Sequence, residues 1–248
     1  MDRNHYRQYY QLERRHWWFR IRERILFNEI KRRLPAGRGL TILNVGSATG
    51  RSSEMLQAFG EVTSVEYDEE CCRFCNEELK IPTIQASLLE MPLPDNSYDL
   101  VCAFDVVEHI EDDKAAVQAL HKACKKDGLV FITVPAFQSL WSRHDEINHH
   151  FRRYRKGNLL ALLNGIKALV VRISYFNALL FPMIFLFRKT QQVFRSTKQE
   201  NTAAYTSDFD KHRLDKWFEK IFSAEPALLK RVNFPAGVSL MLMWQKLD

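Results

Sequence analysis

A glycine-rich turn and a later carboxylate give the first indication of chemistry. The apolar run 40–45 leads into Gly46 to Gly50 (GSATG), and Glu66 ends a second apolar run 20 positions after Gly46. Glycine at the carboxyl end of a strand lets the backbone approach a ligand without obstruction by a Cβ atom. An acid at this separation is placed to accept the hydroxyls of a ribose. The two features together indicate a cofactor that contains adenosine.

The same turn disfavours two other kinds of nucleotide site. Gly50 is followed by Arg51, Ser52 and Ser53, so the Gly-Lys-Ser/Thr ending of a triphosphate-binding loop is missing. A dinucleotide site has the pattern G-x-G-x-x-G, whereas Ala48 lies between the two glycines here. A cofactor other than a nucleoside triphosphate or a dinucleotide is therefore favoured.

Short apolar runs alternate with helical stretches through the middle of the chain. The pattern predicts strands at 40–45, 62–65, 83–85, 98–104 and 129–134, and helices at 52–59, 69–79 and 113–125. Such alternation predicts parallel strands with crossover helices on both faces, which is a doubly wound α/β sheet. Ligands of this fold bind at the carboxyl ends of the strands.

The order and spacing of these motifs resemble the class I S-adenosylmethionine-dependent methyltransferases, in particular the small-molecule branch with the type 11 domain. The resemblance covers a core at about 40–135 and includes the segments 90–101 and 105–110. It implies a Rossmann-like seven-stranded sheet whose last strand, at 238–246, is antiparallel. It also implies S-adenosyl-L-methionine as the cofactor and in-line methyl transfer as the reaction.

The resemblance also implies a set of cofactor-binding residues. The first turn would hold the methionine part, Glu66 the ribose and Tyr67 the adenine, while the ends of the third and fourth strands would meet the adenine edge and the methyl donor. The implied residues are Asn44, Gly46, Ser47, Gly50, Glu66, Tyr67, Ser87, Leu88, Phe104, Asp105 and His109.

Three positions differ from the usual pattern of the family. Asn44 and Ser87 stand where acids are usual, and Ala48 stands where glycine is usual. Asn and Ser keep hydrogen-bonding atoms but lose the charge. Ala48 fits this turn only if its φ is negative, which is therefore the expectation.

The region after Pro135 carries the candidate acceptor site. The block 141–154 is rich in His, Arg and aromatic residues and, together with 16–20, resembles a group of bacterial methyltransferases often associated with glycosyltransferases. Because it follows the fifth strand, it should arch over the methyl donor. His144, Asp145, His149 and His150 are candidates for the base that a hydroxyl or amine acceptor needs, and Asp145 could orient a histidine. Loop polarity and salt bridging are the competing interpretation, and the spacing of the histidines predicts no metal site.

The arginines of this block are candidate anion ligands. Arg152, Arg153 and Arg155 follow the histidines closely and are suited to hold a phosphate or a carboxylate of the acceptor.

Positive charge is concentrated in a basic, aromatic N-terminal arm, residues 1–39, with a helical pattern over 6–34. The net charge of the 248-residue chain is +6, and residues 1–40 alone hold eleven Lys and Arg against four acids. An anionic membrane surface is a candidate partner, and an ordinary solvated helix face is the alternative. Nucleic acid is disfavoured, because the Asn-Pro-Pro-Tyr type of tetrapeptide that resembles base-methylating enzymes is absent after the fourth strand.

The C-terminal region, 136–248, is expected to form an acceptor site with a lid. It contains a short helix at 159–164, a strand at 168–175, an apolar helix at 178–195, a polar linker at 196–207 and a helix at 209–222. The apolar run 178–187 is too short to span a bilayer and fits a membrane-interface helix, a lid or a core helix. The five cysteines and the missing secretory leader favour a reducing, cytoplasmic location.

Two functions follow from these observations. The first is an S-adenosylmethionine-dependent methyltransferase that acts on a small or lipid-linked acceptor. The alternative is a membrane-peripheral binding module with a degenerate methyltransferase fold, which the three departures at positions 44, 48 and 87 would explain.

Overall fold

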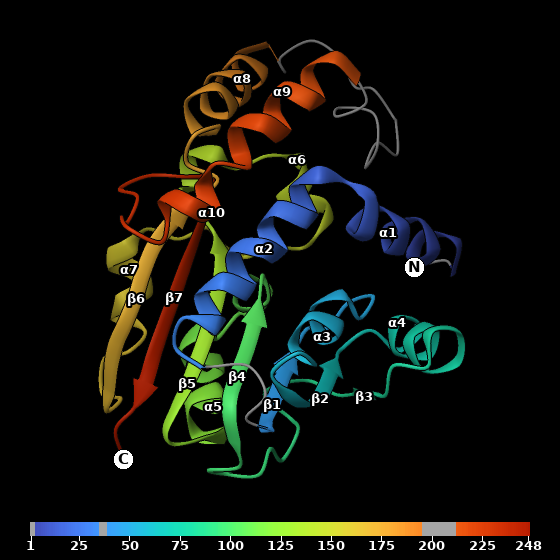
Figure 1. Cartoon of the computed structure of the whole chain (residues 1–248), viewed down its shortest axis with the longest axis vertical. Coiled ribbons are helices and arrows are strands. Elements are labelled where there is room, and N and C mark those ends of the chain that lie inside the picture. Colours follow the sequence, from blue (N-terminus) through green and yellow to red (C-terminus); the bar gives the residue numbers. More distant parts are fainter. Residues whose placement is uncertain (1–2, 35–38, 195–211) are drawn as a thin grey trace.

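A seven-stranded mixed sheet with the order β3-β2-β1-β4-β5-β7-β6 forms the centre of the molecule (Figure 1). The computed structural model describes residues 3–34, 39–194 and 212–248. The strands are β1 (Leu40–Val45), β2 (Gly60–Glu66), β3 (Thr83–Gln85), β4 (Tyr98–Phe104), β5 (Cys124–Pro135), β6 (Ala168–Phe176) and β7 (Ser239–Lys246). β1 to β5 run parallel, and β7 lies antiparallel between β5 and β6. The predicted sheet with its antiparallel last strand is confirmed.

Both faces of the sheet are buried. Along β1, Leu43 and Val45 belong to one hydrophobic core, while Leu40 and Ile42 belong to the other. Successive side chains of a strand point to opposite faces, so an almost uninterrupted apolar run is what a strand covered on both sides requires.

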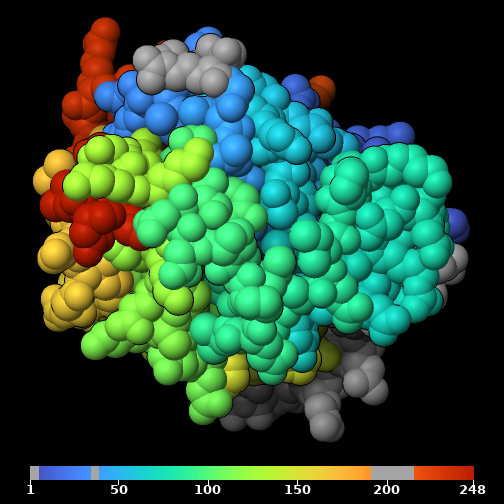
Figure 2. Space-filling view, turned by 90° about the horizontal axis from the view of Figure 1, so that it is seen from below, coloured from blue at the N-terminus to red at the C-terminus, as the bar shows by residue number. Residues whose placement is uncertain are grey.

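The helices form a layer on each face. They are α1 (Arg3–Arg15), α2 (Trp17–Lys31), α3 (Arg51–Leu56), α4 (Glu69–Phe74), α5 (Asp113–Ala123), α6 (Arg143–Ile147), α7 (Lys156–Ala161), α8 (Phe181–Phe194), α9 (His212–Phe222) and α10 (Glu225–Leu228). α2 and α3 supply buried residues to one core, and α5 and α7 to the other. α1 and α6 lie beyond the carboxyl ends of the parallel strands (Figure 1). Figure 2 views the opposite end, where the cyan-to-green part of the chain forms most of the surface.

The N-terminal arm is two helices and not one. His16 has an extended backbone between α1 and α2, with φ −72° and ψ 131°, and its Nδ1 accepts a hydrogen bond from the Trp18 amide at 3.2 Å. The side chain thereby caps the start of α2. Five apolar residues of α2 are buried in the core on one face of the sheet: Trp17, Ile21, Ile25, Leu26 and Ile30. The second half of the arm is thus part of the core.

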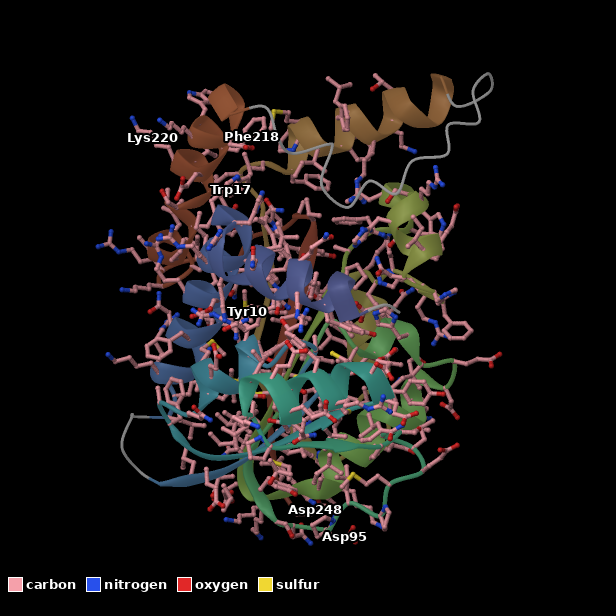
Figure 3. The ribbon with its side chains drawn as sticks, turned by 90° about the vertical axis from the view of Figure 1, so that its right-hand side faces the viewer. Tyr10, Trp17, Asp95, Phe218, Lys220 and Asp248 are labelled. Atoms are coloured by element: carbon pink, nitrogen blue, oxygen red, sulfur yellow. The ribbon has the colours of Figure 1, made fainter. Side chains whose placement is uncertain are left out.

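The C-terminal region differs from the sequence prediction mainly at its boundaries. The expected apolar helix 178–195 begins at Phe181, and the expected linker 196–207 lies outside the described residues. α9 packs against the arm, where the ring centroids of Trp17 and Phe218 lie 6.5 Å apart (Figure 3). Among the described helices, none combines the length and the apolar character that a bilayer crossing requires.

Candidate active site

The turn after β1 depends on its two glycines. Gly46 and Gly50 have φ values of 69° and 79°, in the left-handed region that favours glycine. A Cβ atom at Gly46 would lie 2.3 Å from Val106 Cγ2, and one at Gly50 would lie 2.6 Å from Ile81 Cδ1. Both the backbone angle and the neighbouring side chains therefore require glycine at these positions.

The expectation of a negative φ at Ala48 is wrong. Its φ is 45°, where an alanine is strained by its own Cβ atom. The Ala48 amide donates to Glu66 Oε2 at 2.8 Å, and the Cys75 thiol donates to the Ala48 carbonyl at 3.1 Å. These two contacts hold the strained residue, since both of its backbone polar groups have a partner.

Glu66 organises the backbone around it and keeps capacity for a ligand. Its Oε1 accepts hydrogen bonds from the amides of Tyr67 at 2.8 Å and Asp68 at 3.2 Å. Oε2 accepts only from Ala48 among the described residues. A carboxylate oxygen has two acceptor positions, so Oε2 can take one further donor, such as a ribose hydroxyl.

Asn44 and Ser47 are buried under the turn. Asn44 has no exposed surface, and its amide nitrogen donates to Ser52 Oγ at 2.8 Å and Ser53 Oγ at 2.9 Å. It therefore fixes the start of α3. Ser47 Oγ has no hydrogen-bond partner among the described residues although it is buried. A buried hydroxyl without a partner is costly, which suits a position that a ligand completes.

The predicted adenine contacts lie at the ends of β2 and β3. Tyr67 follows Glu66 directly and is 75% exposed, so its ring is free to meet a planar ligand. Ser87 follows β3 and is partly buried, and its carbonyl accepts from the amides of Glu90 and Met91 in a tight turn. Leu88 is buried in the core and helps to position that turn.

At the end of β4 the structure brings together residues that are distant in the sequence. Asp105, with φ 57°, accepts hydrogen bonds from Arg22 Nη2 at 2.8 Å and from Thr133 Oγ1 at 3.0 Å. Phe104 is buried and packs edge to face on Phe131, so its side chain belongs to the core. Sequence reasoning missed Arg22 because it lies 83 positions before its partner, and no local pattern marks it.

The arm pairs its charges with the core around the turn. Three ion pairs join α1 or α2 to the segments after β1 and β2: Arg14 with Glu54 at 2.6 Å, Glu23 with Arg51 at 2.5 Å and Arg7 with Glu78 at 2.9 Å. Arginines that hold protein carboxylates are less available to phosphates. The proposed contact of the arm with an anionic membrane surface therefore has no support from these residues.

Glu13 of α1 reaches the turn itself. The Thr49 hydroxyl donates to Glu13 Oε2. Burial raises the pKa of the Glu13 carboxyl to about 7, although the hydrogen bond from Thr49 and the nearby Arg14, Arg22 and Arg51 act in the opposite direction.

The histidine-rich block after β5 is built around a buried ion pair. Arg153 donates from Nε to Asp145 Oδ1 at 2.7 Å and from Nη2 to Oδ2 at 3.0 Å, and both side chains are almost wholly buried. Asp145 also accepts from the amide and the hydroxyl of Ser142, which caps α6. Burial alone would raise the pKa of Asp145, but hydrogen bonds from His150 and Arg153 outweigh it and hold the pKa well below its usual range.

The three predicted catalytic residues have different surroundings. Asp145 faces His150, whose Nδ1 lies 2.9 Å from its Oδ1. The His144 ring lies 6.2 Å from that of His150, and His149 is an exposed residue with φ 55°. The structure therefore groups His150 with Asp145, a pairing that the spacing of five residues did not single out.

Two of the candidate anion ligands are already engaged. Arg152 pairs with Asp113 at 2.7 Å and donates to the Glu111 carbonyl at 2.6 Å, and Arg153 is committed to Asp145. Arg155 is exposed, and its guanidinium lies 6.0 Å from the centroid of the Phe137 ring.

His109 ends a short helical turn, Val107–His109, directly after β4. Its ring meets that of His150 edge to face, with the centroids 4.5 Å apart. Part of His109 remains exposed, yet surrounding protein atoms and the neighbouring His150 lower its pKa to about 4. The imidazole is therefore neutral near pH 7.

These residues fit S-adenosylmethionine at the carboxyl edge of the sheet. The glycines let a ligand approach the backbone, Ser47 Oγ and Glu66 Oε2 offer polar atoms, and Tyr67 offers an exposed ring. Asn44 supports the turn through its side-chain hydrogen bonds, and Ser87 supports the loop after β3 through its backbone carbonyl.

Comparisons with known proteins identify a methyltransferase domain in this chain. Residues 43–132 match the family model described as a methyltransferase domain. A Mycobacterium tuberculosis protein named "Probable S-adenosylmethionine-dependent methyltransferase" is 28% identical over 126 residues, which are 50% of this chain and 44% of that protein. A ubiquinone/menaquinone biosynthesis C-methyltransferase from Escherichia fergusonii is 22% identical over 138 residues, 50% of this chain and 55% of that one. The aligned regions thus cover about half of these curated relatives.

Solved structures show the same fold over most of the chain. A SAM-dependent methyltransferase from Archaeoglobus fulgidus has a TM-score of 0.57 at 17% identity, covering 96% of this chain and 99% of that one. A geranyl diphosphate methyltransferase in complex with SAM has a TM-score of 0.58 at 12% identity, covering 90% and 85%. At these identities the likeness concerns the fold alone.

Proposed function

From the match of residues 43–132 to a methyltransferase domain, we propose that this chain is a class I S-adenosylmethionine-dependent methyltransferase and that it methylates a small or lipid-linked acceptor. When bound, the cofactor supplies an electrophilic methyl group on a sulfonium. In an in-line displacement, the acceptor atom would bond to the methyl carbon while the carbon–sulfur bond broke and its electron pair stayed on sulfur. The residues of this chain align the two reactants and exclude water.

The observation that carries this proposal is the arrangement at the ends of β1 and β2. Gly46 and Gly50 hold the turn open, and Glu66 points an oxygen with a spare acceptor position toward it. We assign the ribose to Glu66, the adenine to Tyr67 and the amino-acid end to the turn near Ser47.

Calorimetric titration with S-adenosylmethionine and S-adenosylhomocysteine tests the donor site. Replacing Glu66→Gln keeps the size of the side chain but removes the charge, and we expect an affinity loss of about tenfold or more. Glu69→Gln is the matched control, because Glu69 forms only an exposed pair with Arg73. Equal affinity of the Glu66→Gln variant and the wild-type protein would contradict the assignment.

The apolar surface of α8 supports an acceptor with an apolar part. Met183, Leu186 and Phe187 are 39%, 65% and 54% exposed. At its start, α8 packs on the chain that follows β5, where the ring centroids of Phe137 and Phe181 lie 5.4 Å apart. An exposed apolar helix beside the block is suited to bind the apolar chain of an acceptor while the polar groups of the acceptor face the methyl donor.

A label-partition experiment distinguishes the acceptor classes. The protein is incubated with cell extract and S-adenosylmethionine carrying a labelled methyl group, and the label is then divided between organic solvent and water. We expect label in the organic phase that depends on the protein and that falls with Glu66→Gln at a low concentration of S-adenosylmethionine. Label confined to the aqueous phase would contradict the lipid-linked acceptor.

A hydroxyl or amine acceptor also has to lose a proton. We propose His144 and His149 as candidate bases, because they belong to the same block and histidine is the commonest general base in enzymes. Burial lowers the pKa of His144, which favours the neutral imidazole that can accept a proton. Asp145 would act as a positioning residue and not as a base, since it is buried and held by Arg153.

We also infer a reducing, cytoplasmic setting. The cysteines of the chain are all free and buried. Buried thiols without disulfides are typical of proteins that work where thiols stay reduced.

A further inference from the structure

Glu108, His109 and His150 bring three metal-ligating atoms together beyond the end of β4. One carboxylate oxygen and two imidazole nitrogens all lie within 4.8 Å of one another. Glu108 and His109 come from the turn after β4, and His150 from the block after β5. We propose that these three side chains bind a divalent transition-metal ion.

Glu108 carries the strongest argument, because its buried carboxyl group lacks a partner. The residue has no exposed surface, and neither carboxylate oxygen has a hydrogen-bond partner among the described residues. The nearby arginines are directed elsewhere, Arg22 to Asp105 and Arg153 to Asp145. A buried carboxylate without a partner is strongly destabilising. A cation at the three-atom cluster would remove that cost.

His150 is oriented as metal-binding histidines usually are. Its Nδ1 lies 2.9 Å from Asp145 Oδ1, and its side chain is only 8% exposed. This contact leaves Nε2 as the ligating atom, and a carboxylate behind a ligating imidazole fixes the tautomer and strengthens the ligand. Arg153 in turn holds Asp145 from both oxygens, so the support is rigid.

The donor set indicates the class of metal. Two imidazole nitrogens and one carboxylate suit Zn²⁺, Co²⁺ or Fe²⁺, whereas Mg²⁺ and Ca²⁺ prefer sites made of oxygen atoms. Three protein ligands also leave a coordination position for water or a substrate atom, which is the arrangement of catalytic sites and not of closed structural ones.

The position of the cluster gives the metal a place in the reaction. Glu108 lies three residues after Asp105, at the edge of the sheet where the methyl donor is expected. An acceptor hydroxyl bound to the ion would lose its proton more readily and become a better nucleophile. This step rests on the proposed function, whereas the binding of the metal does not.

The test measures metal binding by the full chain without an affinity tag. The protein is stripped with a chelator, then titrated with Co²⁺ by visible absorption and with Zn²⁺ by calorimetry, both without S-adenosylmethionine. We expect one ion per chain. Glu108→Gln should weaken binding by about tenfold or more. His149→Asn is the matched control and should bind normally, because His149 lies outside the cluster and Asn tolerates its φ of 55°.

Thermal unfolding separates loss of the ligand from loss of the fold. Without metal, Glu108→Gln should unfold at about the same temperature as the wild-type chain or a higher one, since both chains then bury a side chain of the same size without a partner. With Zn²⁺, the wild-type chain and His149→Asn should be stabilised and Glu108→Gln should not. The inference is overturned if the wild-type chain binds neither ion, or if Glu108→Gln binds as well as the wild-type chain. Failure of S-adenosylmethionine to bind would contradict the proposed function and leave this result standing.

Discussion

The glycine turn and the histidine-rich block lie at the same edge of the sheet, but the structure holds them in different ways. The turn uses strained backbone, with positive φ at Gly46, Ala48 and Gly50, and is tied down by single hydrogen bonds. The block has its two-armed ion pair between Asp145 and Arg153 at its centre. The turn is therefore set by local backbone geometry, and the block by buried charge.

The two regions also differ in how their carboxylates titrate. Asp145 has a pKa well below its usual range, so it stays ionised at all ordinary pH values. Glu13, which holds Thr49 in the turn, has a pKa raised by burial to about 7. The comparison predicts that the contribution of the Asp145–Arg153 pair to stability is insensitive to pH but is lost when one charge is removed. It also predicts that the contribution of the turn to stability depends on pH.

The largest expected effect is on the block. Asp145→Asn leaves Arg153, whose side chain is 3% exposed, without a balancing charge. We expect the free energy of unfolding, measured with urea, to fall by about 3 to 5 kcal/mol. Glu69→Gln, which breaks an exposed pair, should cost less than about 1 kcal/mol.

A second substitution makes this prediction sharper. Adding Arg153→Met to Asp145→Asn removes the unpaired charge and should restore much of the lost stability. If the double variant were less stable than Asp145→Asn, the ion pair would not be the main support of the block.

The turn could be predicted from the sequence more completely than the block. The turn is recognisable because Gly46, Gly50 and Glu66 lie close together in the chain and each carries a local requirement for its residue type. The alternating apolar runs likewise predict the sheet, because a strand that is buried on both faces is apolar along its own length. Strand and helix ends shift by a few residues, as at β5, which starts at Cys124 and not at 129.

The block and the arm were harder to predict because their partners are far apart in the chain. Arg22 meets Asp105 across 83 positions, and Glu108 meets His150 only after the fold is complete. The basic arm was interpreted from its charge alone, but the charge does not show that carboxylates such as Glu54 and Glu78 balance it. Sequence reasoning finds residues that act through their neighbours and misses those that act through long-range contacts.

The pH dependence of the turn is the second prediction. The folded pKa of Glu13, about 7, lies above its ordinary value of 4.5. The protonated form is therefore favoured by folding. The stability that this preference gives the folded chain is fully present below pH 4.5 and is lost as the pH rises through 7. Between pH 5 and pH 8.5 the wild-type chain should lose about 1 to 3 kcal/mol of stability relative to Glu13→Gln.

Urea unfolding of both proteins at the two pH values checks this difference. Glu13→Gln keeps an oxygen to accept from Thr49, and every other group titrates in both proteins, so the difference isolates Glu13. Parallel changes in the two proteins would mean that Glu13 is ionised throughout and that the turn is as insensitive to pH as the block.

The smallest expected effect concerns the strained residue of the turn. Ala48→Gly removes the Cβ atom that is unfavourable at φ 45°, while its amide can still donate to Glu66. The relief of about 1 to 2 kcal/mol exceeds the extra entropy that glycine loses on folding, about 0.5 to 1 kcal/mol. We expect a net gain of about 0.5 to 1 kcal/mol in the free energy of unfolding.

The control substitution should change the free energy of unfolding in the opposite direction. Ala224 is exposed and has φ −77° and ψ −26°, so Ala224→Gly relieves nothing and should lower stability by about 0.5 to 1 kcal/mol. Paired unfolding curves of the two variants therefore measure strain directly. A loss at both positions would mean that the contacts of Ala48 with Glu66 and Cys75 already absorb the strain, and the turn would then be no more strained than the block.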